Sequence, residues 1–568
     1  MRNLLRLIPL LAALAANAAA HAAEPVFIHN AKGLTLDAEG KVQRFDALLT
    51  DAEGRVKAIG QSAHLQAAAK GARRIDAQGR VLMPGLTDAH GHMLDLGLTR
   101  RSLELRNTAD LGAALDAVLA YATVHADAAW ILGSGWNQAI WKLGRFPTAA
   151  ELDSAESHRP VWLVRVDGHA GWANSRALQI AGITRETPDP SGGRIERDAE
   201  GNPTGVLVDA AQDLVERHVP APTQAEVRAA LEAARTELLS LGLTGIHDAG
   251  IGDAADRELR AMAQGGSLRL RVDGMARITD AALIQRLRTS GPVQPMADGM
   301  YSLRAIKVFA DGALGSRGAA LLAPYSDAPE STGLLFQSER ELAAQMRPMV
   351  ELGFQVNVHA IGDAANRQVL SAFEAMRRVF GTKSVMLRHR IEHAQVIALN
   401  DIPRFAADGV IASVQPVHAT SDMNMAEDRV GHERIQGAYA WQRLLQSGAR
   451  LACGSDFPVE EPTPWAGLYA AVTRQDAEGH PPGGWYGAQA MTRVQALACF
   501  TTWAAYAAHR EDDLGSLMPG HRADFILVDR DPLKVAPKEL LQTKVLETWV
   551  GGQRVHSADT STAPLQAP

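Results

Sequence analysis

Two histidines separated by a single glycine, His90 and His92, form the sharpest chemical signal in the sequence. They close the segment Asp88-Ala89-His90-Gly91-His92, which follows an apolar run. In an extended segment, side chains two positions apart point the same way and lie about 6.5 Å apart, so both imidazoles can reach one ion. Neutral imidazole is a common metal ligand. An H-x-H pair alone is also typical of ordinary loop histidines, so its meaning depends on the residues that accompany it.

Three further residues of metal-ligating type each close an apolar run elsewhere in the chain. His359 follows QVNV, His393 follows HRIE, and Asp456 follows ACGS. If these runs are parallel barrel strands, their carboxyl ends meet at the face where barrel enzymes place catalytic residues. Packing alone hardly explains four histidines and an aspartate at the same end of their strands. We therefore expect a metal site at this face.

Lys307 is anomalous because it lies among apolar residues, in the run LRAIKVFADG. A free ammonium group is costly to bury. The side chain could therefore extend to solvent, pair with an acid such as Asp311, or react through its amine. Burial lowers the pKa of a lysine and leaves the amine nucleophilic. Addition of carbon dioxide would give a carbamate, an anionic ligand with two oxygens that could bridge two cations.

The elements that must position these residues alternate between strand-like and helix-like segments, a pattern typical of a parallel α/β sheet. Stretches such as AEVRAALEAARTELLSLG and SERELAAQMRPMVELG have apolar residues at helical spacing between the strand candidates. Eight such units predict a (β/α)8 barrel of the TIM type. The expected strands are 81–90, 242–250, 268–275, 303–312, 354–362, 388–396, 409–419 and 450–459.

The gap after the first expected strand, residues 100–240, is too long for a loop. It contains its own strand-like segments, WILGSG and PVWLVRVDGH, so we expect an inserted α+β subdomain. Short alternating segments at both chain ends predict antiparallel strands that pair into a small β-sandwich. The expected divisions are 23–83 with 515–557 for the sandwich, 84–514 for the barrel, and 558–568 for a flexible tail.

Residues 1–22 have the features of a secretory signal peptide. Arg2 and Arg6 give a basic start, an apolar run follows, and Ala20-His21-Ala22 is a small-residue cleavage site. The apolar run is too short for a confident membrane span, and a buried core helix is the alternative. We expect a periplasmic or secreted protein whose mature chain has no membrane span.

The bulk composition is close to average for a soluble globular protein and argues against some partners. Apolar residues make up 46% of the 568 residues and charged residues 21%, as in an ordinary globular protein. The net charge of −7 argues against a nucleic-acid binder, which would normally have a basic face.

The two cysteines, Cys453 and Cys499, are too few for a disulfide framework, although an exported protein could oxidise them. Cys453 lies in the apolar run RLACGSDF, so we expect a small buried side chain there rather than a metal ligand.

Longer motifs surround these residues and extend over nearly the whole mature chain. They are VLMPGLTDAHGH (81–92), VDGHAGWANSRAL (166–178), KVFADGALGSRGAAL (307–321), NVHAIGDAAN (357–366), IEHAQ (391–395), GSDFPVE (454–460) and GSLMPGHRADFILVD (515–529). Together they resemble the amidohydrolase superfamily, in particular its amidohydrolase 3 branch of metal-dependent hydrolases similar to N-substituted formamide deformylase.

The resemblance implies a barrel flanked by a small β-sandwich and a centre with two divalent metal ions. His90 and His92 with Asp456 would hold the first ion, and His359 and His393 the second. Lys307, carboxylated by carbon dioxide, would bridge both. Zinc is the expected metal, with manganese or iron as alternatives. The ions would activate a hydroxide, and Asp456 would pass its proton to the leaving nitrogen.

Residues that could contact the substrate carry weaker signals, each with a structural alternative. His169 could donate to an oxyanion or act as a hinge residue. Arg317 could bind a substrate acid or pair with a neighbouring carboxylate. Trp136 and Trp141 could wall an apolar pocket or pack the insertion. His247 and His418 lie near strand ends and could support the site from outside.

The expected function is hydrolysis of a C–N bond in a small molecule, such as an amide, formamide or cyclic amide. One alternative is a mononuclear deaminase of a heterocycle. Such relatives typically have a glutamate shortly after the fifth-strand histidine, whereas here Asp363 follows His359, and Lys307 also argues against this option. Another is a non-catalytic periplasmic binding protein on the same barrel. The sequence leaves a homo-oligomer open.

Overall fold

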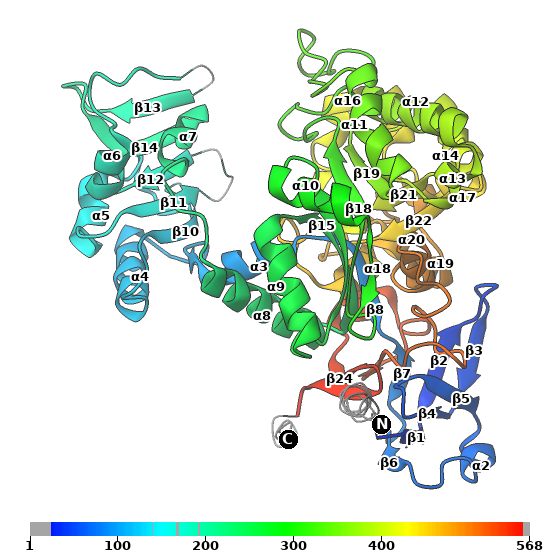
Figure 1. Ribbon diagram of the computed structural model, residues 1–568. Coiled ribbons are helices and arrows are strands. Elements are labelled where there is room, and N and C mark those ends of the chain that lie inside the picture. Colours follow the sequence, from blue (N-terminus) through cyan, green and yellow to red (C-terminus); the bar gives the residue numbers. More distant parts are fainter. Residues whose placement is uncertain (1–23, 139, 166–167, 169, 191–192, 560–568) are drawn as a thin grey trace, which may run out of the picture. The chain divides into compact units, whose positions relative to one another are not determined.

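Eight parallel strands form a nearly closed barrel with helices around it (Figure 1). The computed structural model describes residues 24–138, 140–165, 168, 170–190 and 193–559. The barrel strands are β8 (Leu86–Gly91), β15 (Leu243–Ile251), β16 (Arg271–Arg277), β18 (Tyr301–Phe309), β19 (Gln355–Ala360), β20 (Arg390–His393), β21 (Ile411–Val414) and β22 (Arg450–Cys453). Each corresponds to one expected strand, so the prediction of a TIM-type barrel is confirmed. A short strand, β17 (Val293–Met296), pairs antiparallel with β18.

The barrel closes where the loop after β22 meets the end of β8. The amide of Asp456 donates to the carbonyl of His90 (2.7 Å), and the amide of His92 donates to the carbonyl of Phe457 (2.9 Å). Gly91 permits this approach, because an added Cβ would lie 2.2 Å from the Phe457 ring. Closure therefore places the H-x-H segment directly beside Asp456.

The first expected strand, 81–90, is two strands rather than one. β7 (Val81–Pro84) pairs with strands of the chain ends, and β8 enters the barrel. Gly85 lies between them, where a Cβ would stand 2.2 Å from the Thr244 side chain. A continuous apolar run does not reveal such a division, because both halves are buried.

Helices connect the barrel strands and cover the barrel. α12 is typical: its buried residues include Ala365, Val369, Phe373 and Met376, which recur at helical spacing. α11 begins with a capping box made by Ser338 and Glu341. The helices are α8 (Gln224–Ser240), α9 (Asp253–Gln264), α10 (Ala281–Ser290), α11 (Glu339–Glu351), α12 (Asp363–Phe380), α13 (Thr382–Met386), α14 (Ile402–Asp408), α15 (Pro416–Asp422), α16 (Ala426–Arg434), α17 (Trp441–Gln446), α18 (Pro464–Thr473), α19 (Arg493–Cys499) and α20 (Thr502–Ala507).

Strands from both chain ends pair in one six-stranded sheet next to a four-stranded sheet of the amino-terminal segment. The first contains β3 (Val42–Phe45), β2 (Lys32–Leu36), β7, β23 (Phe525–Val528), β24 (Val545–Val550) and β25 (Gln553–Ser557). The second contains β5 (Val56–Gly60), β4 (Ala47–Thr50), β1 (Val26–His29) and β6 (Arg73–Asp76). One apolar core, which includes Ile28, Leu48, Leu82 and Phe525, contains residues of both sheets.

Residues Leu94–Ala234 form a compact unit separate from the rest of the chain. Its sheet contains β9 (Leu103–Glu104), β10 (Ile131–Trp136), β11 (Val161–Arg165), β12 (Ala170–Ala173), β14 (Pro203–Asp209) and β13 (Gly193–Arg197). Its helices are most of α3 (Met93–Arg101), α4 (Leu111–Val124), α5 (Ala149–Ala155), α6 (Ser175–Ala181) and α7 (Asp213–Glu216), with the first part of α8.

Cys453 and Cys499 form a disulfide between the end of β22 and the end of α19. Cys453 is buried, as expected, and the bond is the oxidation that the sequence left open. The pairing could not be read from sequence, since it depends on how α19 packs against the last barrel strand.

Three expectations fall outside the described residues or concern the membrane. The signal peptide at 1–22 lies outside them, as does nearly all of the tail at 558–568. In the part of the chain that the structure describes, no helix is long and apolar enough to cross a membrane.

Candidate metal centre

His90, His92 and Asp456 meet at the carboxyl end of the barrel. Nε2 of His92 lies 3.1 Å from Oδ1 of Asp456, and Nε2 of His90 lies 3.4 Å from the same oxygen. Their ligand atoms all lie within 4.8 Å of one another, close enough to hold one cation. The backbone hydrogen bonds that close the barrel position all three side chains.

Lys307 points into this centre and is 1% exposed. Its Nζ lies 3.4 Å from Nε2 of His90. Burial penalises the ammonium form and lowers the lysine pKa to about 8. The alternative partner Asp311 instead accepts backbone amides of Ala320, Ile361 and Gly362 at 2.8–3.0 Å. Lys307 is therefore buried among imidazoles, as a reactive amine would be.

His359 and His393 complete the group on the strands β19 and β20. Their ring centroids lie 4.5 Å apart, and that of His393 lies 4.9 Å from that of His90. Nδ1 of His393 bonds the side-chain oxygen of Gln415 (2.9 Å), which leaves Nε2 free for an ion. Nε2 of His359 is buried with no hydrogen-bond partner among the described residues.

The buried imidazoles favour the neutral form that binds metals. Burial lowers the pKa of His90 to about 4 and that of His359 to about 3, and in both cases nearby Lys307 adds to the effect. The neutral nitrogens of His90, His359 and His393, an ionised Asp456 and an unpartnered imidazole nitrogen fit a divalent cation of the zinc type. The donor set is therefore suited to the metal ions that the sequence led us to expect.

Two of the grouped residues have unusual backbone conformations. His393 has φ +75° and Asp456 has φ +64°, in the left-handed region that non-glycine residues rarely adopt. In a regular strand, neighbouring side chains point to opposite faces. Here the side chains of Glu392 and His393 both reach His90, because the strand ends in this turn of the backbone. Such conformations cluster at functional sites.

Glu392 is a functional residue that sequence reasoning missed, although it lies in the motif IEHAQ. Its Oε2 bonds Nδ1 of His90 (2.5 Å), which orients Nε2 of that ring toward the centre. Burial alone would raise the pKa of Glu392, but Arg390 and His90 hold it well below its usual range. Arg390 lies 2.7 Å from the carboxylate (Nε–Oε1) and also donates to Ser413. The signal was a carboxylate in an apolar strand one residue before a ligand.

Asp88 is a second residue that sequence reasoning missed, and it links the end of β8 to the loop after β22. It accepts the amide of His90 (3.0 Å) and both the amide (3.1 Å) and the hydroxyl (2.6 Å) of Ser455. Burial raises its pKa to about 7. These bonds fix the backbone of His90 relative to that of Ser455, the residue before Asp456.

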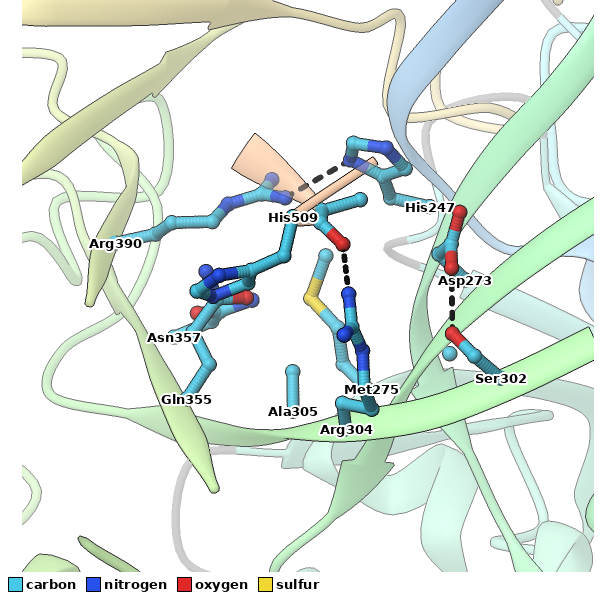
Figure 2. A pocket seen from close by; sticks show the side chains of 12 residues that line it. His247, Asp273, Met275, Ser302, Arg304, Ala305, Gln355, Asn357, Arg390 and His509 are labelled. Atoms are coloured by element: carbon cyan, nitrogen blue, oxygen red, sulfur yellow. Dashed lines mark hydrogen bonds between the residues drawn. The ribbon is translucent and has the colours of Figure 1, made fainter. Parts of the chain in front are cut away.

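The barrel interior toward the amino ends of the strands is polar and tightly filled (Figure 2). Arg390 and His247 point toward each other there, with Nη1 of Arg390 3.0 Å from Nδ1 of His247. The cavity they help to line has a volume of about 20 Å³, which is enough for a single water molecule and far too small for a substrate. His247 therefore supports the site through Arg390 and Glu392.

Two of the expected substrate contacts have packing or pairing roles within their own parts of the chain. Trp136 is fully buried in the core of the Leu94–Ala234 unit and donates to the carbonyl of Leu163 (2.7 Å), so it packs that unit. Arg317 pairs with Asp327 (2.9 Å), which was the alternative to a substrate role. His169 lies outside the described residues. His418, by contrast, approaches Asp456 and forms a second possible ligand group with it and His393.

Comparisons with known proteins agree with this geometry. The amidohydrolase family model matches residues 73–556. The chain is 33% identical to Protein LONG AFTER FAR-RED 3 of Arabidopsis thaliana over 519 residues, which are 89% of this chain and 87% of that protein. It is 30% identical to the N-substituted formamide deformylase of Arthrobacter pascens over 548 residues, 93% and 97% of the two chains.

A solved structure of an uncharacterized metal-dependent hydrolase from Pyrococcus furiosus superposes with a TM-score of 0.76 and 28% identity. It covers 90% of this chain and 100% of its own. Both sequence and fold thus lead to the same assignment: the protein belongs to the amidohydrolase family of metal-dependent hydrolases.

Proposed function

We propose that this amidohydrolase cleaves a C–N bond outside peptides, in an amide, formamide or cyclic amide. The observation that carries the proposal is the convergence of His90, His92, His393 and Asp456 on a buried Lys307. The printed name of the 30% identical relative, an N-substituted formamide deformylase, supports a substrate of this class.

The residues divide between two zinc ions, which when bound would activate a water molecule and polarise a carbonyl group. His90, His92 and Asp456 would hold the first ion, and His359 and His393 would hold the second. Lys307, as its carbamate, would supply an anionic ligand to both. The lowered pKa of Lys307 supports this role, because a larger share of the amine is unprotonated and able to take up carbon dioxide.

The surrounding residues hold protons and orient ligands. Glu392 keeps the proton of His90 on Nδ1 and so directs Nε2 to the ion. Asp456 turns Oδ1 toward the two histidines, which leaves Oδ2 able to accept a proton from water and deliver it to the leaving nitrogen.

Asp363, three positions after the end of β19, gives the deaminase alternative little support. Asp363 stands where deaminase relatives place a glutamate, but it accepts the amide of Leu322 (2.8 Å) at the start of α12. The binding-protein alternative has no support from the ligand set, since all six expected residues are present.

The proposal extends to the compartment and the divisions of the chain. Export, directed by residues 1–22, is supported by the Cys453–Cys499 disulfide, because disulfides persist mainly in oxidising compartments. The shared core of the two chain-end sheets supports a composite β-sandwich, and the separate unit Leu94–Ala234 supports an inserted subdomain. The mass of the mature protein tests the cleavage after Ala22.

The experiment on function combines metal analysis with a substrate screen. Purified protein, supplied with zinc and bicarbonate, is assayed on a panel of N-acyl amines, N-formyl amines and cyclic amides, and the released amine is scored. We expect about two metal equivalents and turnover on at least one member. One equivalent with release of ammonia from a heterocycle would favour the deaminase, and no bound metal would favour the binding protein.

A further inference from the structure

His418 approaches the metal centre but has no part in the ligand assignment above. It lies in α15, which begins two residues after β21. Its ring stacks on that of His393, with centroids 6.0 Å apart and planes inclined by 13°. Its Nε2 lies 3.9 Å from Oδ2 of Asp456. The helix that follows the seventh barrel strand thus contributes a side chain to the site, next to the residue that handles the proton.

The two oxygens of Asp456 face different neighbours. Oδ1 lies 3.4 Å from His90 and 3.1 Å from His92, measured to Nε2 of each ring. Oδ2 is the oxygen that faces His418. The carboxylate therefore has one side turned toward the first ion and one side turned toward His418.

Nε2 of His418 is buried and has no hydrogen-bond partner among the described residues. The nearby carboxyl groups are occupied elsewhere: Glu460 accepts the hydroxyl of Ser421 (2.6 Å), and Asp422 accepts that of Tyr439 (2.5 Å). A separation of 3.9 Å from Asp456 is too long for a direct hydrogen bond. It leaves room for a polar atom of a bound molecule to contact both groups.

We propose that His418 donates a hydrogen bond from Nε2 to the leaving nitrogen of the scissile C–N bond. This inference rests on the proposed function. Asp456 delivers its proton to that nitrogen, so the free oxygen of Asp456 marks where the nitrogen lies. His418 faces this same oxygen with Nε2, and the tautomer that carries its ring proton on Nε2 can donate to the nitrogen.

A donor at this position acts mainly on the transition state. In a planar amide, the nitrogen lone pair is delocalised into the carbonyl and accepts hydrogen bonds poorly. The lone pair becomes localised as the carbonyl carbon turns tetrahedral, so the hydrogen bond strengthens as the reaction proceeds. Such an interaction raises kcat with little effect on KM. It matters most for strongly basic leaving amines, whose departure needs the most help.

The test compares His418→Ala and His418→Asn with the wild type on two substrates that share one acyl group. One substrate releases an alkylamine and the other releases nitroaniline, a far better leaving group. For the alkylamide we expect His418→Ala to lower kcat by about 10²–10³-fold, the range seen when one transition-state donor is removed. For the nitroanilide we expect less than a tenfold loss, with KM nearly constant and both metal equivalents retained.

His418→Asn keeps a donor group and should recover part of the lost rate on the alkylamide. His432→Ala is the matched control, because His432 is exposed and pairs with Glu427 on α16. It should behave as wild type on both substrates.

Two results would overturn the inference for an active wild-type enzyme. Loss of a metal equivalent in both His418 variants would make His418 a ligand, in line with its grouping with His393 and Asp456. Equal losses on the two substrates would remove the link to the leaving nitrogen. A wild-type enzyme that hydrolyses none of the amides would instead reject the proposed function, and this inference with it.

Discussion

Buried polar groups at the two ends of the barrel differ in whether they have hydrogen-bond partners. At the carboxyl end, Nε2 of His359 and of His418 is buried without a partner among the described residues. At the amino end, Arg271 is 1% exposed but makes two bonds to Asp524, Nε–Oδ2 (2.5 Å) and Nη2–Oδ1 (2.9 Å). Asp524 also accepts the amide of Gly551 (2.7 Å), so barrel and chain-end strands are joined there.

The contrast separates groups that stabilise the fold from groups kept ready for a ligand. Buried polar atoms are nearly always satisfied in folded proteins, because an unpaired one costs free energy. The Arg271–Asp524 pair at the amino end follows this rule. The carboxyl end departs from it at His359 and His418, together with left-handed backbone at His393 and Asp456, as expected where bound ions or a substrate would supply the missing partners. Substitutions at the two ends should therefore affect different measurements.

The largest effect is expected for Lys307→Ala. It removes the group that we propose to bind both ions, so at least one metal equivalent and nearly all turnover should be lost. The loss should exceed the roughly 100-fold cost of removing an outer partner of a ligand. Small carboxylic acids with added metal should restore part of the activity. Metal analysis and kcat measure this, with exposed Lys383→Ala as the control. Full activity with both ions bound would refute the bridging role.

Glu392→Gln should have the next largest effect on activity. The amide keeps the shape of the side chain but removes the charge that orients His90. Loss of such a partner costs about 10–100-fold in metal affinity or activity. Titration with a competing chelator measures the affinity. Glu374→Gln, at an exposed pair with Arg378 on α12, is the control. Unchanged affinity would show that His90 is oriented without Glu392.

Asp524→Asn tests the amino end and should affect stability rather than catalysis. It leaves Arg271 buried without its ion pair, which costs about 3–5 kcal/mol. Urea unfolding of the metal-free protein measures the change, and kcat per folded molecule should stay constant. Arg44→Met breaks the more exposed pair with Asp531 and should cost less than about 1 kcal/mol. A fall in kcat for Asp524→Asn would contradict the assignment of stability to the amino end and catalysis to the carboxyl end.

The smallest effect is expected for the double substitution Cys453→Ala with Cys499→Ala. The disulfide closes a segment whose ends are 46 residues apart, and such a link contributes about 2–4 kcal/mol. The unfolding midpoint of the variant should match that of the reduced wild type and lie below that of the oxidised wild type. Coincident curves for all three would mean that the fold holds these residues without help from the bond.

The barrel and most of the metal centre could be predicted because each strand end can be recognised from a short stretch of sequence. Each ligand closes its own apolar run, and parallel strands bring those ends together. Glu392 was missed because its partner, His90, lies 302 positions away and meets it only after closure. For Trp136 and Arg317 the sequence left a substrate contact and a structural role open, because a motif shows which residues occur together, whereas the direction of a side chain depends on tertiary packing.

The single residue between β7 and β8 limits which segments of this protein can be removed or exchanged. Gly85 joins a strand of the chain-end sheet to the first strand of the barrel, against Thr244 and without room for a side chain. Removing the amino-terminal segment would remove β7, the strand that directly precedes β8, and β8 carries His90. The chain ends are therefore poor candidates for exchange between homologues, and a minimal catalytic fragment should retain both of them.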